Sequence, residues 1–211
     1  MALPLRLFVG LGNPGRRYAA TRHNAGAWFV ERVARARSLE LRPEGRFQSL
    51  VARGRTPDGI EFRLALPQSY MNESGHPVAA LARYYRISPP EMLVAYDELD
   101  LKPGSVKLKL GGGSAGHNGL KDIVEQLGSG EFWRMRFGIG HPRDAALAQG
   151  EVVDYVLHPP RAEERSAIDD AMERALGVWP ELASGEMERA MLVLHTRPRP
   201  HAPADGGSSK P

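Results

Sequence analysis

The stretch LRLFVGLGNPGRRYAATRHNAGAWFVERVARAR, residues 5–37, contains the first strand, loop and helix that the sequence predicts. Residues 5–12 are mostly apolar, as in a strand that is buried on at least one face. Residues 13–24 form a polar stretch rich in arginine, and the apolar spacing typical of a helix begins only near Ala25. A strand followed by a loop and a helix is typical of the α/β class.

Gly10, Gly12 and Gly15 in this stretch match the G-x-G-x-x-G pattern of dinucleotide-binding proteins. In those proteins the last glycine opens a helix, and an acidic residue about 20 positions later ends a second strand. Here Gly15 is followed by a polar loop, and the region that should supply the acidic residue is still inside the predicted helix. We therefore interpret the glycines as a sharp turn after the strand, stiffened by Pro14.

Further strands and helices alternate along the chain. The apolar spacing predicts strands over residues 46–54, 61–67, 91–100, 105–110 and 132–140, and helices over residues 76–86 and 120–128. Beyond His158 the pattern is helical, and residues 162–179 are its clearest segment. This alternation favours a single α/β domain over residues 1–196, with a mixed, largely parallel central sheet flanked by helices. Residues 197–211, RPRPHAPADGGSSKP, have no core-forming pattern and are expected to be a disordered tail.

The composition is that of an ordinary globular protein, because 42% of the 211 residues are hydrophobic and 25% are charged. The chain contains no cysteine, which excludes disulfides and thiolate metal sites. No stretch has the pattern of a signal peptide or the length of a membrane span. We therefore expect a cytoplasmic protein without a membrane partner.

Charge is distributed unevenly along the chain, although the net charge is only +3. Residues 1–55 contain eleven arginines against three glutamates and no aspartate, whereas residues 161–190 contain four arginines against eight acidic residues. One part of the molecule should therefore be strongly electropositive, which favours a phosphate-rich partner. The alternative is a set of solvated helix faces with no binding role.

Gly112, Ser114 and Gly116 match the G-x-S-x-G pattern of a serine nucleophile, between a predicted strand and a predicted helix. That pattern places the serine after a strand buried in a central sheet. The preceding SVKLKL, residues 105–110, instead has lysines at alternate positions and therefore one wet face. A serine esterase using Ser114 is thus a less favoured alternative, and we interpret Ser114 as a small turn residue.

Five polar residues occupy loop positions next to predicted strand ends: Asn13, His23, Asn72, Asp97 and Asn118. Loops at strand ends are where open α/β sheets bind ligands. These residue types suit hydrolysis of an acyl bond by water. A neutral imidazole takes a proton from the water, a carboxylate fixes the tautomer of the imidazole, and amide groups stabilise the oxyanion.

Four segments, GLGNPGRRYAATRHNAG, QSYMNESG, DELDL and GGGSAGHNGLKD, resemble the signature segments of bacterial-type peptidyl-tRNA hydrolases, in the same order. The resemblance runs from about Leu5 to His195. It implies an enzyme that hydrolyses the ester joining a peptide, or another N-blocked aminoacyl group, to the 3′ end of tRNA, and so recycles tRNA from aborted translation. It also implies a monomeric, cytoplasmic, metal-free enzyme without a cofactor, with a mixed sheet flanked by helices.

The resemblance also implies roles for the polar residues at the strand ends. His23 is the base that acts on water, and Asp97 holds it in its basic, correctly oriented form. Asn13 helps to separate blocked from unblocked aminoacyl groups. Asn72 and Asn118 bind the substrate and can stabilise the tetrahedral oxyanion.

Two further groups of residues follow from the same resemblance. Tyr18 and Tyr70 line the substrate channel, although the second position is often phenylalanine in the family. Lys107, Lys109 and Arg136 match a basic clamp for the terminal phosphate of tRNA. The rival interpretation is a non-catalytic RNA-binding protein on the same scaffold, which would use the basic surface but would not need the base.

Overall fold

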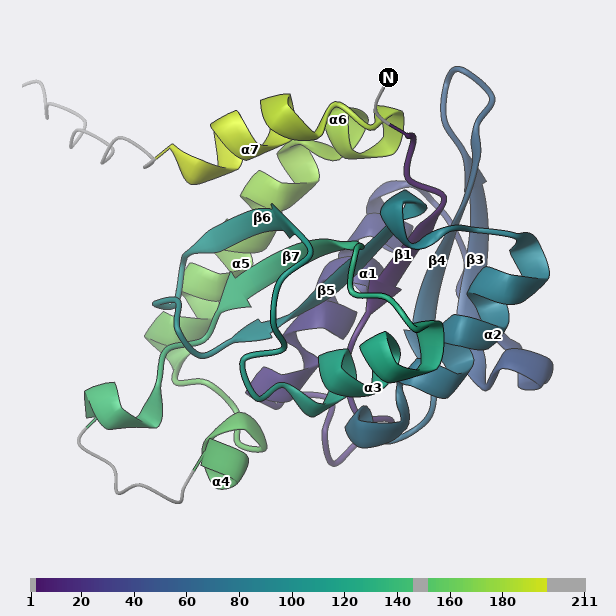
Figure 1. Cartoon of the computed structure of the whole chain (residues 1–211). Helices are drawn as coiled ribbons and strands as arrows, with labels where there is room; N and C mark the ends of the chain where they lie inside the picture. The colour runs from purple at the N-terminus through teal and green to yellow at the C-terminus, as the bar shows by residue number, and fades with distance from the viewer. Residues whose placement is uncertain (1–2, 146–151, 197–211) are drawn as a thin grey trace, which may run out of the picture.

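The computed structural model describes residues 3–145 and 152–196. Its centre is a sheet of seven strands in the order β2-β3-β4-β1-β5-β7-β6 (Figure 1). The strands are β1 (Leu7–Gly10), β2 (Arg42–Glu44), β3 (Ser49–Arg55), β4 (Glu61–Pro67), β5 (Met92–Glu98), β6 (Val106–Leu110) and β7 (Trp133–Gly138). The first strand of the chain therefore lies in the middle of the sheet.

The central strands are parallel, and the strands at both edges are antiparallel. β1 pairs in parallel with β4 and β5, and β5 pairs in parallel with β7. β2, β3 and β6 join the sheet by antiparallel pairing. The predicted mixed sheet is confirmed, with its parallel part in the centre, where the carboxyl ends of the strands meet on one side.

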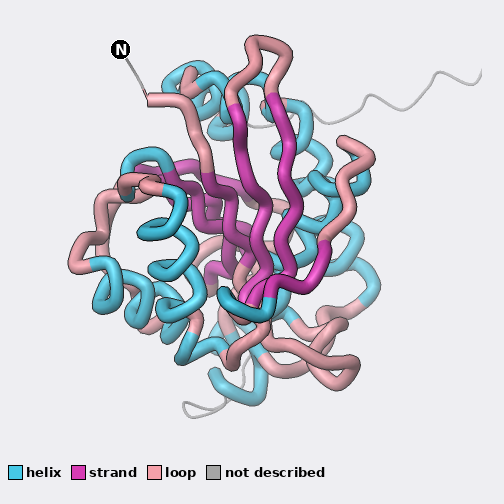
Figure 2. The backbone as a smooth tube through the Cα atoms, turned by 90° about the vertical axis from the view of Figure 1, so that its right-hand side faces the viewer, coloured by secondary structure: helices cyan, strands magenta, loops and turns pink. Residues whose placement is uncertain are grey.

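Helices cover both faces of the sheet (Figure 2). One face carries α1 (Ala25–Ala36), α5 (Ala162–Gly177), α6 (Trp179–Ser184) and α7 (Met187–His195), and the other carries α2 (Gly75–Tyr85) and α3 (Asn118–Leu127). Successive side chains of a strand point to opposite faces, so Phe8 packs in the first core while Leu7 and Val9 pack in the second. Burial on both sides explains the continuous apolar sequence of β1.

The predicted elements are largely confirmed, but the prediction misses β2 and α4 (Val152–Val156). These elements contain three and five residues, which is too short to show a hydrophobic period. β3 begins at Ser49 rather than at residue 46, because Gly45–Phe47 form a 3₁₀ turn before it. The helix predicted over residues 162–179 ends at Gly177, and α6 follows it.

The three glycines after β1 do not form a dinucleotide-binding turn. Only Gly15 has a left-handed backbone, with φ of 96°, so the predicted sharp turn is made at Gly15 alone. A Cβ on Gly10 would lie 2.5 Å from the carbonyl oxygen of Gly26, which shows that α1 packs directly on the end of β1. Because α1 begins only at Ala25, its N-terminus follows the polar loop rather than the turn at Gly15.

Residues 197–211, for which the sequence predicts a disordered tail, lie outside the described residues. Within residues 3–145 and 152–196, no helix combines the length and the apolar character needed to cross a membrane.

Candidate active site

A cavity of about 430 Å³ lies next to the carboxyl ends of the central strands. Asn13 and His23 reach it from the loop after β1, and Asp97 reaches it from the end of β5. His117 and Asn118 contribute from the N-terminal end of α3, and α4 forms an apolar wall. This position matches the crevice in which open α/β sheets bind ligands.

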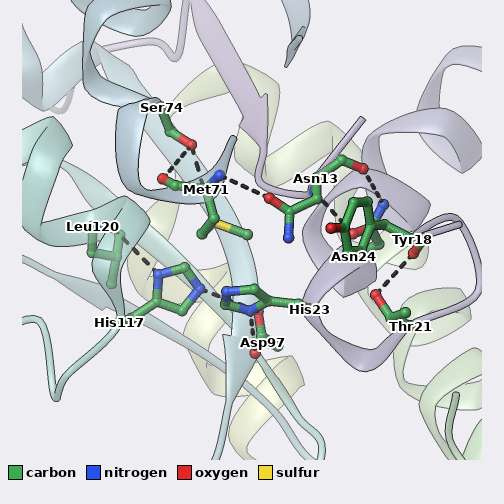
Figure 3. Close-up of polar contacts among 10 residues, drawn as sticks. All are labelled: Asn13, Tyr18, Thr21, His23, Asn24, Met71, Ser74, Asp97, His117 and Leu120. Atoms are coloured by element: carbon green, nitrogen blue, oxygen red, sulfur yellow. Dashed lines mark hydrogen bonds and ion pairs between the residues drawn. The ribbon is translucent and has the colours of Figure 1, made fainter. Parts of the chain in front are cut away.

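Partly buried His23 and buried Asp97 form a hydrogen-bonded pair in this cavity (Figure 3). The Nδ1 atom of His23 lies 3.0 Å from each carboxylate oxygen of Asp97, whose side chain is only 2% exposed. A carboxylate accepts hydrogen bonds and does not donate them, so Nδ1 carries the proton and the lone pair of neutral His23 is on Nε2. A general base for water needs this tautomer.

The electrostatic coupling of this pair favours the same assignment. Burial alone would raise the pKa of Asp97, but the neighbouring imidazoles of His23 and His117 hold it well below its usual range. Burial alone would lower the pKa of His23, but the Asp97 carboxylate outweighs burial and raises this pKa above its ordinary value. Asp97 is therefore ionised at neutral pH and stabilises the imidazolium that forms when His23 accepts a proton.

His117, which the sequence analysis did not single out, is a second histidine bonded to Asp97. Its Nε2 atom lies 3.1 Å from Oδ1 of Asp97, and its Nδ1 atom accepts a 3.3 Å hydrogen bond from the main-chain N–H of Leu120 (Figure 3). Because this N–H can only donate, Nδ1 of His117 is unprotonated and Nε2–H donates to the carboxylate. Asp97 thus accepts hydrogen bonds from two imidazoles.

The glycine-rich segment of residues 111–117 brings His117 into the site. The segment leaves β6 beside the start of β7 and runs back to the end of β5. Buried Arg134 donates hydrogen bonds to the carbonyl oxygens of Gly112 and Gly113, which fixes this path. The sequence signal for His117 is its position directly before α3, where its side chain caps the helix.

His23 lies between two buried polar residues that fix its loop. Arg22 donates to three main-chain carbonyls at and after the end of α4, and its Nη2 atom lies 2.7 Å from Oε2 of Glu164 in α5. Oδ1 of Asn24 accepts a 2.9 Å hydrogen bond from the main-chain N–H of Asn13, and Nδ2 of Asn24 donates a 3.0 Å hydrogen bond to the carbonyl oxygen of Asn13. These contacts hold the base in place from both sides, as a preorganised site requires.

The side-chain amide of Asn13 has a defined orientation. Its Oδ1 atom accepts a 2.8 Å hydrogen bond from the main-chain N–H of Met71 (Figure 3). This bond fixes the amide with Oδ1 towards the main chain of Met71, and the Nδ2 donor points to the side where His23 lies. An N–H donor in this place suits a carbonyl oxygen or an oxyanion.

The other predicted substrate-binding residues occupy different places. Asn118, the first residue of α3, lines the cavity. Asn72 is exposed in the turn after β4 and is not among the described residues of the cavity wall. The rings of Tyr18 and Tyr70 lie 6.5 Å apart, edge to face, on the loops after β1 and β4, and Tyr70 is 59% exposed.

The predicted basic clamp lies at the β6 edge of the sheet. Lys107 on β6 pairs in register with Arg136 on β7, and Lys109 follows on the same face of β6. Both lysines are exposed, whereas Arg136 is partly buried and its Nε atom donates a 2.9 Å hydrogen bond to Glu98. Burial lowers the pKa of Arg136, but the carboxylate of Glu98 outweighs burial and raises it.

Ser114 contributes to the cavity wall but lacks the setting of a serine nucleophile. The strand before it, β6, is the antiparallel edge of the sheet rather than a buried central strand. Both ring nitrogens of His117, the neighbouring imidazole, are already hydrogen-bonded, to Asp97 and to the main-chain N–H of Leu120. The structure therefore favours the interpretation of Ser114 as a turn residue.

His23, Asp97 and His117 also have ligand atoms within 4.8 Å of one another, so they could hold a metal ion. In the arrangement described, the ring nitrogens that face Asp97 both carry protons. A metal ion would have to displace these protons and would take the histidine away from its role as a base.

Comparison with known proteins identifies the family and its fold. The sequence model for the family described as peptidyl-tRNA hydrolase matches residues 7–201. The crystal structure of peptidyl-tRNA hydrolase from Acinetobacter baumannii is 43% identical, with a TM-score of 0.85 over 90% of this chain and 94% of that chain. A single-substitution variant of that enzyme is 42% identical, with a TM-score of 0.86 over 92% and 96% of the two chains. The chain belongs to the peptidyl-tRNA hydrolase family.

Proposed function

We propose that this hydrolase cleaves the ester between a peptide, or another N-blocked aminoacyl group, and the 3′ end of tRNA by direct attack of water activated at His23. One observation carries this mechanism, namely the contact of His23 Nδ1 with the buried carboxylate of Asp97, which leaves Nε2 as the base. Family membership supports the reaction, and the cavity contains the base, its carboxylate and amide donors together.

The reaction has two steps. In the first, Nε2 of His23 takes a proton from water while the water oxygen bonds to the ester carbonyl carbon, which produces a tetrahedral oxyanion. The amides of Asn13 and Asn118 donate hydrogen bonds to that oxyanion. In the second step, the bond from the carbonyl carbon to the ribose oxygen breaks, and the imidazolium returns its proton to that oxygen. The products are the free acid and tRNA, with no covalent intermediate.

Asp97 and His117 control where the proton resides during this reaction. Asp97 stabilises the imidazolium of His23 and keeps it in the correct tautomer. The second hydrogen bond, from Nε2–H of His117, keeps Asp97 ionised, so the carboxylate does not remove the proton from the imidazolium.

Asn13 separates blocked from unblocked aminoacyl groups in this proposal. An N-blocked group offers a carbonyl oxygen, which the Nδ2 donor of Asn13 binds, whereas a free ammonium group only donates hydrogen bonds. The acceptor that an ammonium group would need, Oδ1 of Asn13, is already bonded to the main-chain N–H of Met71. Tyr18, Tyr70 and Asn72 would contact the substrate further out, along the exposed loops after β1 and β4.

The tRNA part of the substrate is bound by the basic clamp of Lys107, Lys109 and Arg136, in which Arg136 and Lys107 are cross-strand neighbours. The clamp would hold the terminal phosphate while the ester lies at His23. The enzyme would act as a monomer in the cytoplasm, without a metal or cofactor, through the domain of residues 1–196.

The proposal is tested by release of the acyl group from N-acetyl-aminoacyl-tRNA by the purified protein, with a chelator present. The matched substrate is the same aminoacyl-tRNA without the acetyl group. We expect chelator-resistant release from the blocked substrate and little from the unblocked one. Binding of tRNA without release would instead support the non-catalytic RNA-binding protein, and equal release from both substrates would refute the role of Asn13.

A further inference from the structure

Glu98, the residue after Asp97, is a second buried carboxylate at the end of β5, and the reaction described above does not use it. It is 4% exposed. Its Oε2 atom accepts a 2.9 Å hydrogen bond from Nε of Arg136 and lies 3.5 Å from the hydroxyl of Tyr96. Its Oε1 atom accepts a 3.2 Å hydrogen bond from the main-chain N–H of Asp100. Glu98 therefore accepts hydrogen bonds on both oxygens.

The contact with Glu98 fixes how Arg136 faces its surroundings. A guanidinium is planar and carries its donors in a rigid fork, so bonding at Nε sets the direction of both terminal nitrogens. Arg136 is opposite Tyr96 on β5 and opposite Lys107 on β6, so the three side chains share one face of the sheet. The side chain of Arg136 is still 23% exposed, so its outer end is accessible to a ligand.

The same carboxylate lines the cavity that contains His23. The ring of Tyr96 packs edge-on against the ring of His117, with 5.0 Å between their centroids, and His117 donates to Asp97. Tyr96 and Glu98 line the same cavity as His23. Glu98 therefore lies between the cavity of His23 and a neighbouring groove that Arg136 lines together with Lys107 and Lys109.

We propose that Glu98 is a positioning residue that holds Arg136 as a fork for the terminal 5′ phosphate of tRNA and so sets the distance from that phosphate to the ester at His23. This inference rests on the proposed function. The carboxylate of Glu98 balances the charge of Arg136. A second positive charge for the phosphate therefore comes from Lys107, the cross-strand neighbour of Arg136. The fixed fork favours a substrate with a terminal phosphate over the same substrate with a 5′ hydroxyl, and the preference lies in KM.

Glutamine at position 98 is a sharp test because it keeps the size of the side chain. An amide has one acceptor oxygen, whereas Glu98 uses both oxygens as acceptors, towards Arg136 and towards the main chain of Asp100. Glu98→Gln must therefore lose one of the two contacts and also the ion pair. The matched control is Asp100→Asn, which changes the net charge equally at an exposed side chain two positions away.

The experiment compares N-acetyl-aminoacyl-tRNA carrying its 5′ phosphate with the same tRNA after phosphatase treatment. For the wild-type protein and Asp100→Asn, we expect KM to be roughly tenfold lower for the phosphorylated substrate, as for a charge-assisted pair. In Glu98→Gln this ratio should fall to within about twofold of unity, while kcat changes by less than about threefold. Arg136→Lys, which keeps the charge but not the fork, should lose the same ratio.

Three results would overturn the inference. They are an unchanged KM ratio in Glu98→Gln or Arg136→Lys, an equal loss of kcat on both substrates in Glu98→Gln, and a wild-type protein that hydrolyses both substrates with the same KM. Absence of hydrolysis by the wild-type protein would instead refute the proposed function itself, so the two failures are distinguishable. Thermal unfolding of each variant monitors the fold, and Arg136→Lys tests the same contact if Glu98→Gln unfolds.

Discussion

Replacing Asp97 with asparagine removes the charge between His23 and His117 but keeps the shape of the side chain. Both oxygens of Asp97 lie 3.0 Å from Nδ1 of His23, so an amide at this position presents one N–H donor towards the Nδ1 proton. Two donors repel each other, which favours the tautomer with the proton on Nε2. In that tautomer His23 has no lone pair for the water.

The expected loss can be estimated from the role of the base. A positioned general base contributes about 10² to 10⁴ in rate. At about 1.4 kcal/mol for each factor of ten, this is about 2.8–5.6 kcal/mol of transition-state stabilisation. We expect Asp97→Asn to lose most of it in kcat, because the asparagine no longer stabilises the imidazolium.

The pH dependence of the Asp97→Asn variant gives a second signature. Asp97 raises the pKa of His23, so the pKa of His23 should fall when the carboxylate is replaced. Activity needs unprotonated His23 and therefore rises with pH through this pKa. The acid limb of kcat/KM should move to lower pH in the variant, and the activity on the plateau should be reduced.

The assay is acyl release from N-acetyl-aminoacyl-tRNA over a range of pH, with thermal unfolding as a check of the fold. Asp100→Asn is the matched control, because it makes the same chemical change at a side chain that is 57% exposed. The reasoning is refuted if Asp97→Asn turns over within about threefold of the wild-type rate. It is also refuted if the acid limb moves to higher pH.

Three further predictions concern other parts of the molecule. Ser114→Ala should leave turnover within about twofold of the wild type, and a loss of several orders of magnitude would instead support a serine nucleophile. Lys107→Ala should weaken tRNA binding and lower the slope of log Kd against log salt by about one, whereas an unchanged slope would show that Lys107 does not contact a phosphate. Gly26→Ala should destabilise the fold by about 1–3 kcal/mol and lower Tm by roughly 2–12 °C, because the new Cβ would overlap the carbonyl oxygen of Ala95. Gly45→Ala, with open space around its Cβ, is the control for Gly26→Ala, and an equal Tm in both variants would contradict the packing argument.

The sequence predicted the parts of the fold that depend on local pattern. The start of α1 at Ala25 and the alternation of β6 follow directly from the spacing of apolar residues. The placement of β1 in the middle of the sheet depends on pairing between distant strands, which such spacing does not encode. β2 and α4 are too short to carry a period.

Some contacts of the candidate site could likewise be predicted from the sequence, and others depend on the fold. His23 and Asp97 were predicted as a pair because they belong to motifs that resemble a known family, and the structure places them in contact. The contact of His117 with Asp97 depends on the path of residues 111–117 across the sheet. The pairing of Glu98 with Arg136 depends on the register of β5 and β7. The sequence pattern specifies neither the path of residues 111–117 nor this register.

The central claim is that Nε2 of His23 is the base in this hydrolysis, and the most direct test is the single-turnover rate of His23→Ala with N-acetyl-aminoacyl-tRNA. The protein is held in excess over the substrate, and tRNA binding is measured in parallel. The account predicts a rate lower by about 10² to 10⁴ with tRNA affinity unchanged. A His23→Ala protein that releases the acyl group at the wild-type rate would contradict the account.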